Sequence, residues 1–197
     1  GVPGNQDRSG HALEGLRESG EGLSPGARAV LTTLRAELGL ADEVHGLVAD
    51  CLGVDPRLEQ AVEAALGGHI ETVVARSARA AQLLAAKLSE QELGRATFIA
   101  LDRAEAAVWS RDAGAPPAAV APEGCLGCAA ELVSCSDEYR PVAQALLGNV
   151  LVFDTERHAQ ESFQADNGSS RWHRVSLSGA FFEANGCFSG GRYKPQR

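Results

Sequence analysis

Two kinds of apolar spacing alternate along this chain. Apolar residues three or four positions apart, as at Leu58, Val62 and Leu66, are typical of a helix with one buried face. Short unbroken apolar runs between polar or glycine residues, as in the VLVF of 150–153, are typical of buried strands. Because helices and strands follow each other in turn, the pattern predicts an α/β (α+β) chain.

Helix starts are marked by residues whose side chains can accept a hydrogen bond from the first turn. Such starts are predicted at Ser24-Pro25, Asp55-Pro56, Ser77, Ser136 or Asp137, and Thr155. Strands are predicted over residues 45–52, 69–75, 96–102, 124–133, 150–154 and 171–177. An Asn-Gly pair at 185–186 with apolar residues on both sides predicts a hairpin turn.

The same order of parts occurs twice, at an offset of 81 residues. In each copy a glycine and a small apolar stretch precede an acid, a helix ending in Leu-Gly and an apolar strand. The matched residues are Gly46, Ala49, Asp50, Ala64, Leu66 and Gly67 in the first copy, and Gly127, Ala130, Glu131, Ala145, Leu147 and Gly148 in the second. The repeat predicts two similar small lobes, which must pack together or against a partner because each is too small to bury much core.

Composition places the chain among ordinary globular proteins, with 44% hydrophobic and 22% charged residues and a net charge of −8. No apolar run reaches 18 residues, so no membrane span is predicted. The charge is uneven, because residues 171–197 carry an excess of Arg and Lys over an otherwise acidic chain. This basic segment is a candidate weak contact for DNA, and one alternative function is a nucleic-acid-binding module that uses it. Its basic residues are Arg171, Arg174, Arg192, Lys194 and Arg197.

A second alternative is a metal or thiol-redox module that uses Cys125-x-x-Cys128. There is no second cysteine pair and no histidine at ligand spacing nearby, which favours cysteines that fill small apolar positions. The odd number of five cysteines indicates a reducing, cytoplasmic setting without a disulfide framework. The five histidines are scattered, and the matched acids Asp50 and Glu131 suit helix capping. We therefore predict no catalytic residue, no metal ligand and no cofactor.

Glycines beside strands are a further signal, because a missing side chain lets another backbone approach closely. These glycines predict exposed strand edges that pair with a second chain. The predicted interface glycines are Gly67, Gly68, Gly186, Gly190 and Gly191.

In order, the segments VHGLVADCL, EAALGGHIETVVA, GRATFIALD, GCLGCAAELV, LLGNVLVFD and GCFSGG resemble the hinge of bacterial structural-maintenance-of-chromosomes (SMC) proteins over about residues 40–191. The resemblance implies a homodimerisation module between two coiled-coil arms of a chromosome condensation and segregation ATPase, in the cytoplasm with the nucleoid. It implies no chemistry in the hinge itself, and GxxxxGK[ST] is absent from this sequence. The closing motif of the family commonly begins Pro-Gly, where this chain has Ala184-Asn185.

The resemblance also divides the chain. Residues 1–22 are expected to be a tag, a linker or an arm remnant, and 23–40 an entering helix. Lobe one is predicted over 41–109 and lobe two over 124–191, joined by the Pro/Gly/Ala-rich linker 110–123. Residues 192–197 are expected to begin the exiting arm.

Overall fold

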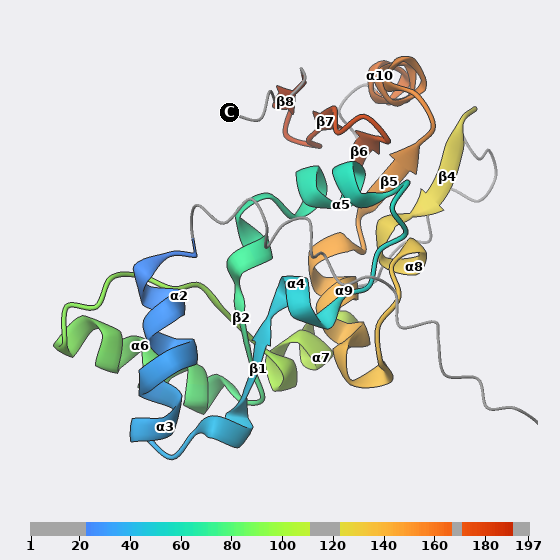
Figure 1. Cartoon of the computed structure of the whole chain (residues 1–197). Helices are drawn as coiled ribbons and strands as arrows, with labels where there is room; N and C mark the ends of the chain where they lie inside the picture. The colour runs from blue at the N-terminus through green and yellow to red at the C-terminus, as the bar shows by residue number, and fades with distance from the viewer. Residues whose placement is uncertain (1–22, 111–122, 167–170, 191–197) are drawn as a thin grey trace, which may run out of the picture.

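The computed structural model describes residues 23–110, 123–166 and 171–190, and Figure 1 shows its two sheets with helices around and between them. The predicted α/β class is confirmed. Sheet one has the order β1-β2-β3 and sheet two the order β4-β5-β6-β7-β8. The strands are β1 (Val44–Leu47), β2 (Val73–Ala75), β3 (Phe98–Ala100), β4 (Cys125–Cys128), β5 (Val150–Phe153), β6 (His173–Ser176), β7 (Phe181–Phe182) and β8 (Phe188–Ser189).

The first three strands of the two sheets follow the same topology. β1 and β4 pair antiparallel with β2 and β5, which pair parallel with β3 and β6. Both first strands shift register beside a glycine, Gly46 with φ +115° and Gly127 with φ +135°. Glycine reaches this backbone region at little cost, so the bulge recurs where the sequence repeats.

The strands predicted over 45–52 and 124–133 are wrong in their second halves. One-turn helices follow the strands, α4 (Val48–Cys51) and α8 (Ala129–Leu132). In the first copy, the Asp50 carboxylate accepts the Leu47 amide at 3.2 Å and holds the turn that replaces the strand. Apolar runs this short do not distinguish a buried strand from a buried helical turn.

The remaining helices largely begin at their predicted caps. Ser24, Ser77 and Thr155 accept amide hydrogens from the first turns of α2, α6 and α10. The helix predicted at Asp55-Pro56 starts later, at Glu59, because the Asp55 carboxylate instead accepts the Arg57 amide in a local turn. The bounds are α2 (Pro25–Ala29), η1 (Val30–Leu34), α3 (Arg35–Glu37), η2 (Ala41–Glu43), α5 (Glu59–Leu66), η3 (Gly67–Glu71), α6 (Ala78–Glu90), α7 (Leu101–Ser110), η4 (Asp137–Tyr139), α9 (Arg140–Leu147) and α10 (Glu156–Ala165).

Three other predicted strands are shorter than expected. η3 replaces the first part of 69–75, α7 replaces the end of 96–102, and β6 covers only part of 171–177. The hairpin predicted at 185–186 is confirmed, since β7 and β8 pair antiparallel around that turn. The predicted linker 110–123 lies mostly outside the described residues.

The segment predicted as an entering helix, 23–40, is helical from Pro25 to Glu37. Its helical part is fully buried at Ala27, Val30 and Leu34, which pack against Leu84 and Leu88 of α6. This segment therefore shares one apolar cluster with β1, β2 and α6.

One apolar core joins the two sheets. It contains Val62 and Leu66 from α5 together with Val142 and Leu147 from α9 and Val150 from β5. The helices cross over between the lobes, because α5 packs against β6 and β7 of sheet two, whereas α9 packs against α7 of the first lobe. Figure 1 shows α5 beside the second sheet and α9 beside α7. None of the helices that the structure describes is long and apolar enough to cross a bilayer.

A strained residue at the end of α6 provides a test of the backbone. Glu92 has φ +52°, a left-handed conformation that costs a residue with a side chain about 1–2 kcal/mol. Glycine removes this cost but adds about 0.5–1 kcal/mol of chain entropy in the unfolded state. We expect Glu92→Gly to raise the free energy of unfolding by about 0.5–1 kcal/mol in denaturant titrations.

The matched control is Gln91→Gly, whose position has φ −96°. It should lower the free energy of unfolding, because no strain is relieved there. A Glu92→Gly protein that unfolds at lower denaturant than the parent would contradict the strained backbone.

Candidate functional site

The outer strand of sheet two is the most conspicuous unpaired edge. β8 ends the strand order, and no strand of the described residues lies on its outer side. Phe188 on this strand has 74% of its surface exposed, the largest value among the exposed large hydrophobic residues of the described part. Its ring stacks on Phe182 of β7, with ring centroids 6.2 Å apart and planes at 19°. An exposed aromatic ring on an open strand edge suits contact with another chain.

Turn hydrogen bonds shape the hairpin that carries this edge. The Glu183 amide donates to the Cys187 carbonyl at 2.7 Å, and the Gly186 amide donates to the Glu183 carbonyl at 2.9 Å. The Asn185 side chain accepts the Cys187 amide at 2.9 Å. Asn185 thus closes the turn through its side chain.

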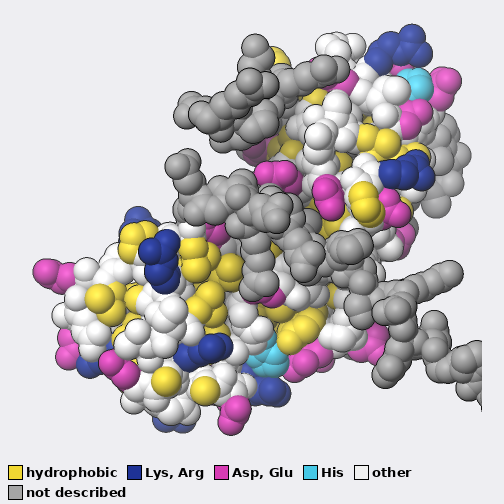
Figure 2. Space-filling model, in the orientation of Figure 1, with side chains coloured by type: hydrophobic (Ala, Val, Ile, Leu, Met, Phe, Trp, Pro, Cys, Tyr) yellow, Lys and Arg dark blue, Asp and Glu magenta, His cyan; other side chains and the backbone are white. Residues whose placement is uncertain are grey.

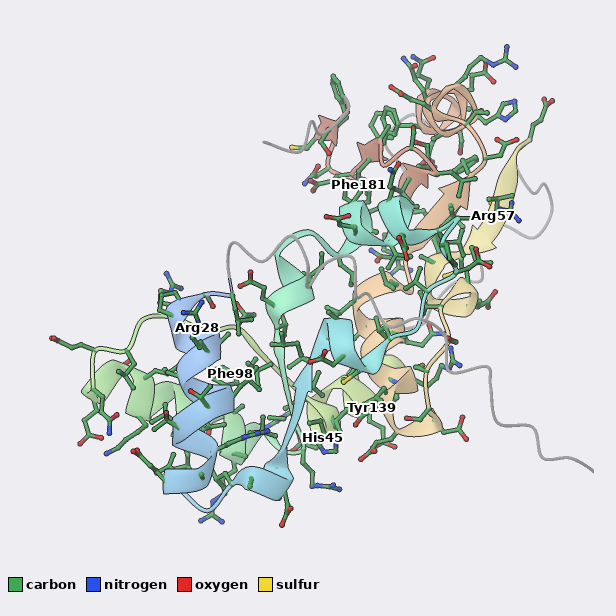
Figure 3. All side chains as sticks on the ribbon, in the orientation of Figure 1. Arg28, His45, Arg57, Phe98, Tyr139 and Phe181 are labelled. Carbon is green, nitrogen blue, oxygen red and sulfur yellow. The ribbon has the colours of Figure 1, made fainter. Side chains whose placement is uncertain are left out.

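The hairpin is also tied to the strand behind it. The Ala184 amide donates to Nδ1 of His173 on β6 at 3.0 Å. The His173 ring lies 5.6 Å from the ring of Phe181, which Figure 3 shows between the hairpin and α5. Burial, and to a smaller extent Arg174, lowers the pKa of His173, while Glu183 raises it.

Two of the predicted interface glycines are explained by their own backbone conformation, and two others are not. Gly67 and Gly186 have φ of +51° and +95°, so their own backbone accounts for them. Gly68 and Gly190 are not among the glycines with positive φ. A Cβ added to Gly68 would meet no atom within 4 Å, and one added to Gly190 would make only an ordinary contact with Glu156 at 3.7 Å. Gly191 lies outside the described residues.

The structure describes two of the predicted DNA contacts, Arg171 and Arg174, and they differ in exposure. Arg174 is only 5% exposed and pairs with Asp166 at 2.6 Å, so its guanidinium is not available at the surface. Arg171 is exposed, whereas Arg192, Lys194 and Arg197 lie outside the described residues. On the face in Figure 2, Lys and Arg side chains are interspersed with Asp and Glu rather than gathered in a patch.

The two cysteines of the Cys-x-x-Cys motif do not converge. Cys128 is buried in the core shared by both lobes, whereas Cys125 packs against a different cluster around Phe153. Burial raises the pKa of Cys128, and burial raises that of Cys51 to about 12. Among the residues with described side chains, no three His, Cys, Asp or Glu are arranged to hold a metal ion. Two thiols that pack into separate apolar clusters do not converge on one metal or redox site.

The structure contains a polar contact between the lobes that the sequence analysis did not predict. Nδ1 of His45 lies 2.9 Å from the Tyr139 hydroxyl, and Glu138 lies 3.8 Å from both His45 and Arg76. Figure 3 shows His45 and Tyr139 close together where the lobes meet. The partners are 94 positions apart, so no local signal connects them. This contact connects two segments that are far apart in the chain and so helps to align the lobes.

The comparisons with known proteins agree on one family. The model of the SMC proteins Flexible Hinge Domain matches residues 41–162. The chain is 31% identical over 183 residues to the chromosome partition protein Smc of Desulfitobacterium hafniense and equally to that of Bacillus subtilis, covering 92% of this chain in each case. It spans about 15% of the length of these relatives.

Solved structures show the same fold. An asymmetric dimer of the Geobacillus stearothermophilus SMC hinge domain is 28% identical with a TM-score of 0.68, covering 92% of this chain and 71% of that one. The Pyrococcus furiosus SMC hinge domain, at 20% identity and a TM-score of 0.57, shares the fold over 94% of this chain and 81% of that one.

The thiols provide a direct test of the cysteine assignment. Cys187 is the exposed cysteine, and Cys51 and Cys128 are buried with raised pKa values. Because the thiolate is the reactive form, we expect Cys187 to react first with a disulfide reagent at pH 8 and the two buried thiols to react last. Cys187→Ser should remove the fast phase. A fast phase that persists in Cys187→Ser and disappears in Cys125→Ser would instead favour a reactive Cys-x-x-Cys motif.

Proposed function

The chain belongs to the SMC flexible hinge family, and from this membership we propose that it joins two copies of a chromosome partition protein by homodimerisation. The β8 edge of lobe two in one chain meets lobe one of the other beside Gly67 and Gly68. Each chain offers two unlike edges, so a two-fold pair makes the same contact twice and closes. The hinge contributes association and no chemistry of its own.

The observation that supports this proposal is that nothing within the protomer explains why two positions, Gly68 and Gly190, are glycine. Neither a positive φ nor a crowded neighbour accounts for glycine at Gly68 or Gly190. Close approach of a partner backbone accounts for both. The exposed Phe188 ring beside Gly190 would then be buried on association, as aromatic anchors at interfaces commonly are.

The wider roles follow from the relatives and are part of the same proposal. The parent protein acts in chromosome partition at the nucleoid, and its ATPase lies outside this segment. We propose lobes over 41–109 and 124–191, with the helical segment within 23–40 packed onto the first lobe and the linker at 110–123. Residues 1–22 and 192–197 lead toward the arms.

A DNA contact at the arm junction has less support. Arg174 is buried in an ion pair, which leaves Arg171 alone among the described basic candidates. The acidic chain, with a net charge of −8, also repels phosphate. We therefore limit the proposal to dimerisation.

A leucine side chain at Gly68 or Gly190 should prevent the close approach of the partner backbone. We expect Gly68→Leu and Gly190→Leu each to weaken the dimer at least about tenfold in sedimentation velocity, because about 1.4 kcal/mol of lost contact has that effect. The unfolding transition should change little, since a Cβ at either position meets no close neighbour in the protomer. Ala86→Leu, at an exposed position on α6, is the matched control and should dimerise normally. Dimerisation that is unchanged in both glycine variants would overturn the glycine contact, and a parent chain that stays monomeric at high concentration would overturn the proposal.

The aromatic anchor is tested separately. We expect Phe188→Ala to cost about 2 kcal/mol of dimerisation free energy, the size usual for a buried interface aromatic. Leu83→Ala is the control, because Leu83 is also exposed, at 48%, but lies on α6 away from β8. Equal dissociation constants for the two variants would place the interface elsewhere.

A further inference from the structure

The interface hairpin is held by the pairing of β7 with β6 and, at its turn, by one further hydrogen bond. Ala184 is the second residue of the turn that the Gly186 amide closes on the Glu183 carbonyl, so the turn itself provides no acceptor for the Ala184 amide. That amide donates instead to Nδ1 of His173, 11 positions earlier on β6. The bond therefore ties the turn of the hairpin to the sheet.

An imidazole can accept at Nδ1 only while that nitrogen carries no proton. The neutral ring of His173 must then carry its proton on Nε2. In the protonated ring both nitrogens are donors, and Nδ1–H would face the Ala184 N–H. Protonation thus removes the bond and replaces it with two opposed donors.

We propose that His173 is a positioning residue for dimerisation, which holds the β7–β8 hairpin in its pairing geometry only while its imidazole is neutral. This inference rests on the proposed function, because β8 at the end of the hairpin is the proposed contact edge. Acid should therefore release the turn and the β8 edge and weaken the dimer, while β7 stays paired with β6. The shared core, to which β8 does not contribute, should stay folded.

Burial and the charged groups near the His173 ring determine whether its pKa is raised or lowered. Glu183, opposite His173 on the hairpin, favours the protonated ring, while Arg174 on β6 and burial, the largest cause, disfavour it and lower the pKa of His173. Two helices also pack against β6: α10 carries Glu156, Arg157, His158 and Glu161, and α5 carries Glu59 and Glu63. β5 and β7 carry no titratable residue. Because the pKa is lowered by folding, the bond contributes fully above the ordinary value of about 6.5 and is lost as pH falls through the lowered value.

The variant His173→Asn tests whether the pH dependence comes from titration of His173, because it can keep the hydrogen bond to Ala184 but cannot titrate. The side-chain oxygen of asparagine can take the place of Nδ1 as an acceptor. Dimer dissociation constants would be measured by sedimentation at pH 7.5 and 5.5 for the parent, His173→Asn and His173→Ala. We expect the parent to weaken at least about fourfold more than His173→Asn across this range, because each of the two hairpins loses one bond.

At pH 7.5, His173→Ala should weaken the dimer by about two- to tenfold for each hairpin, which is about four- to hundredfold for the two hairpins of a dimer. His173→Asn should restore most of this loss. His158→Asn is the matched control. His158 lies on α10 and pairs with Asp154 rather than with the hairpin, so this variant should keep the pH dependence of the parent. An equal pH dependence in the parent and His173→Asn would overturn the proposal.

Amide hydrogen exchange at Ala184 distinguishes this failure from failure of the proposed function. Measured on dilute protein, protection of that amide should fall as pH drops in the parent, after correction for the intrinsic exchange rate, and stay constant in His173→Asn. Protection that behaves this way in a chain that never dimerises would retain the histidine bond and reject the dimer. Protection that is independent of pH in the parent would reject the bond itself.

Discussion

The structure depends on a core that neither lobe could form alone. Sheet one has three short strands, and an apolar face of that size buries too little surface to be stable by itself. The chain meets this constraint by exchanging helices: α5 of the first lobe covers strands of sheet two, and α9 of the second packs against α7 of the first. A backbone bridge between Gly53 and Ser134, with hydrogen bonds of 2.6 and 2.8 Å, joins the lobes beside this core.

In the proposed dimer, this interlocking leaves the strand edges as the surface for association. With the sheet faces occupied by helices, an open route to a partner is backbone pairing at β8, where Phe188 and Gly190 lie. Edge pairing needs a rigid strand, and the hairpin gains rigidity from its Asn-Gly turn, from the stacked Phe182 and Phe188 rings and from the bond to His173. A strand of two residues also limits indiscriminate pairing with other chains.

Polar groups inside the molecule serve alignment rather than chemistry. Arg174 is buried with Asp166 as its partner and holds the end of α10 against β6. His45 and Tyr139 align the two lobes. Buried charges and hydrogen-bonding groups without partners would be costly, so these pairs restrict how the elements can pack. The residues that looked most reactive in the sequence, the paired cysteines, fill apolar positions on different faces of a sheet.

Local signals in the sequence determined the caps at Ser24, Ser77 and Thr155, the hairpin turn at Asn185-Gly186 and the α/β class, because each depends on neighbouring residues. The family was also readable, since its motifs occur in order along the chain. Strand lengths were not readable, because a short apolar run such as VADC suits a buried turn of helix as well as a strand. The burial of Arg174, the separation of Cys125 from Cys128, the exposure of Phe188 and the bond from Ala184 to His173 were decided by the tertiary structure. Each of them depends on contacts between segments that are far apart in the chain, and the spacing of residues along the sequence does not predict such contacts.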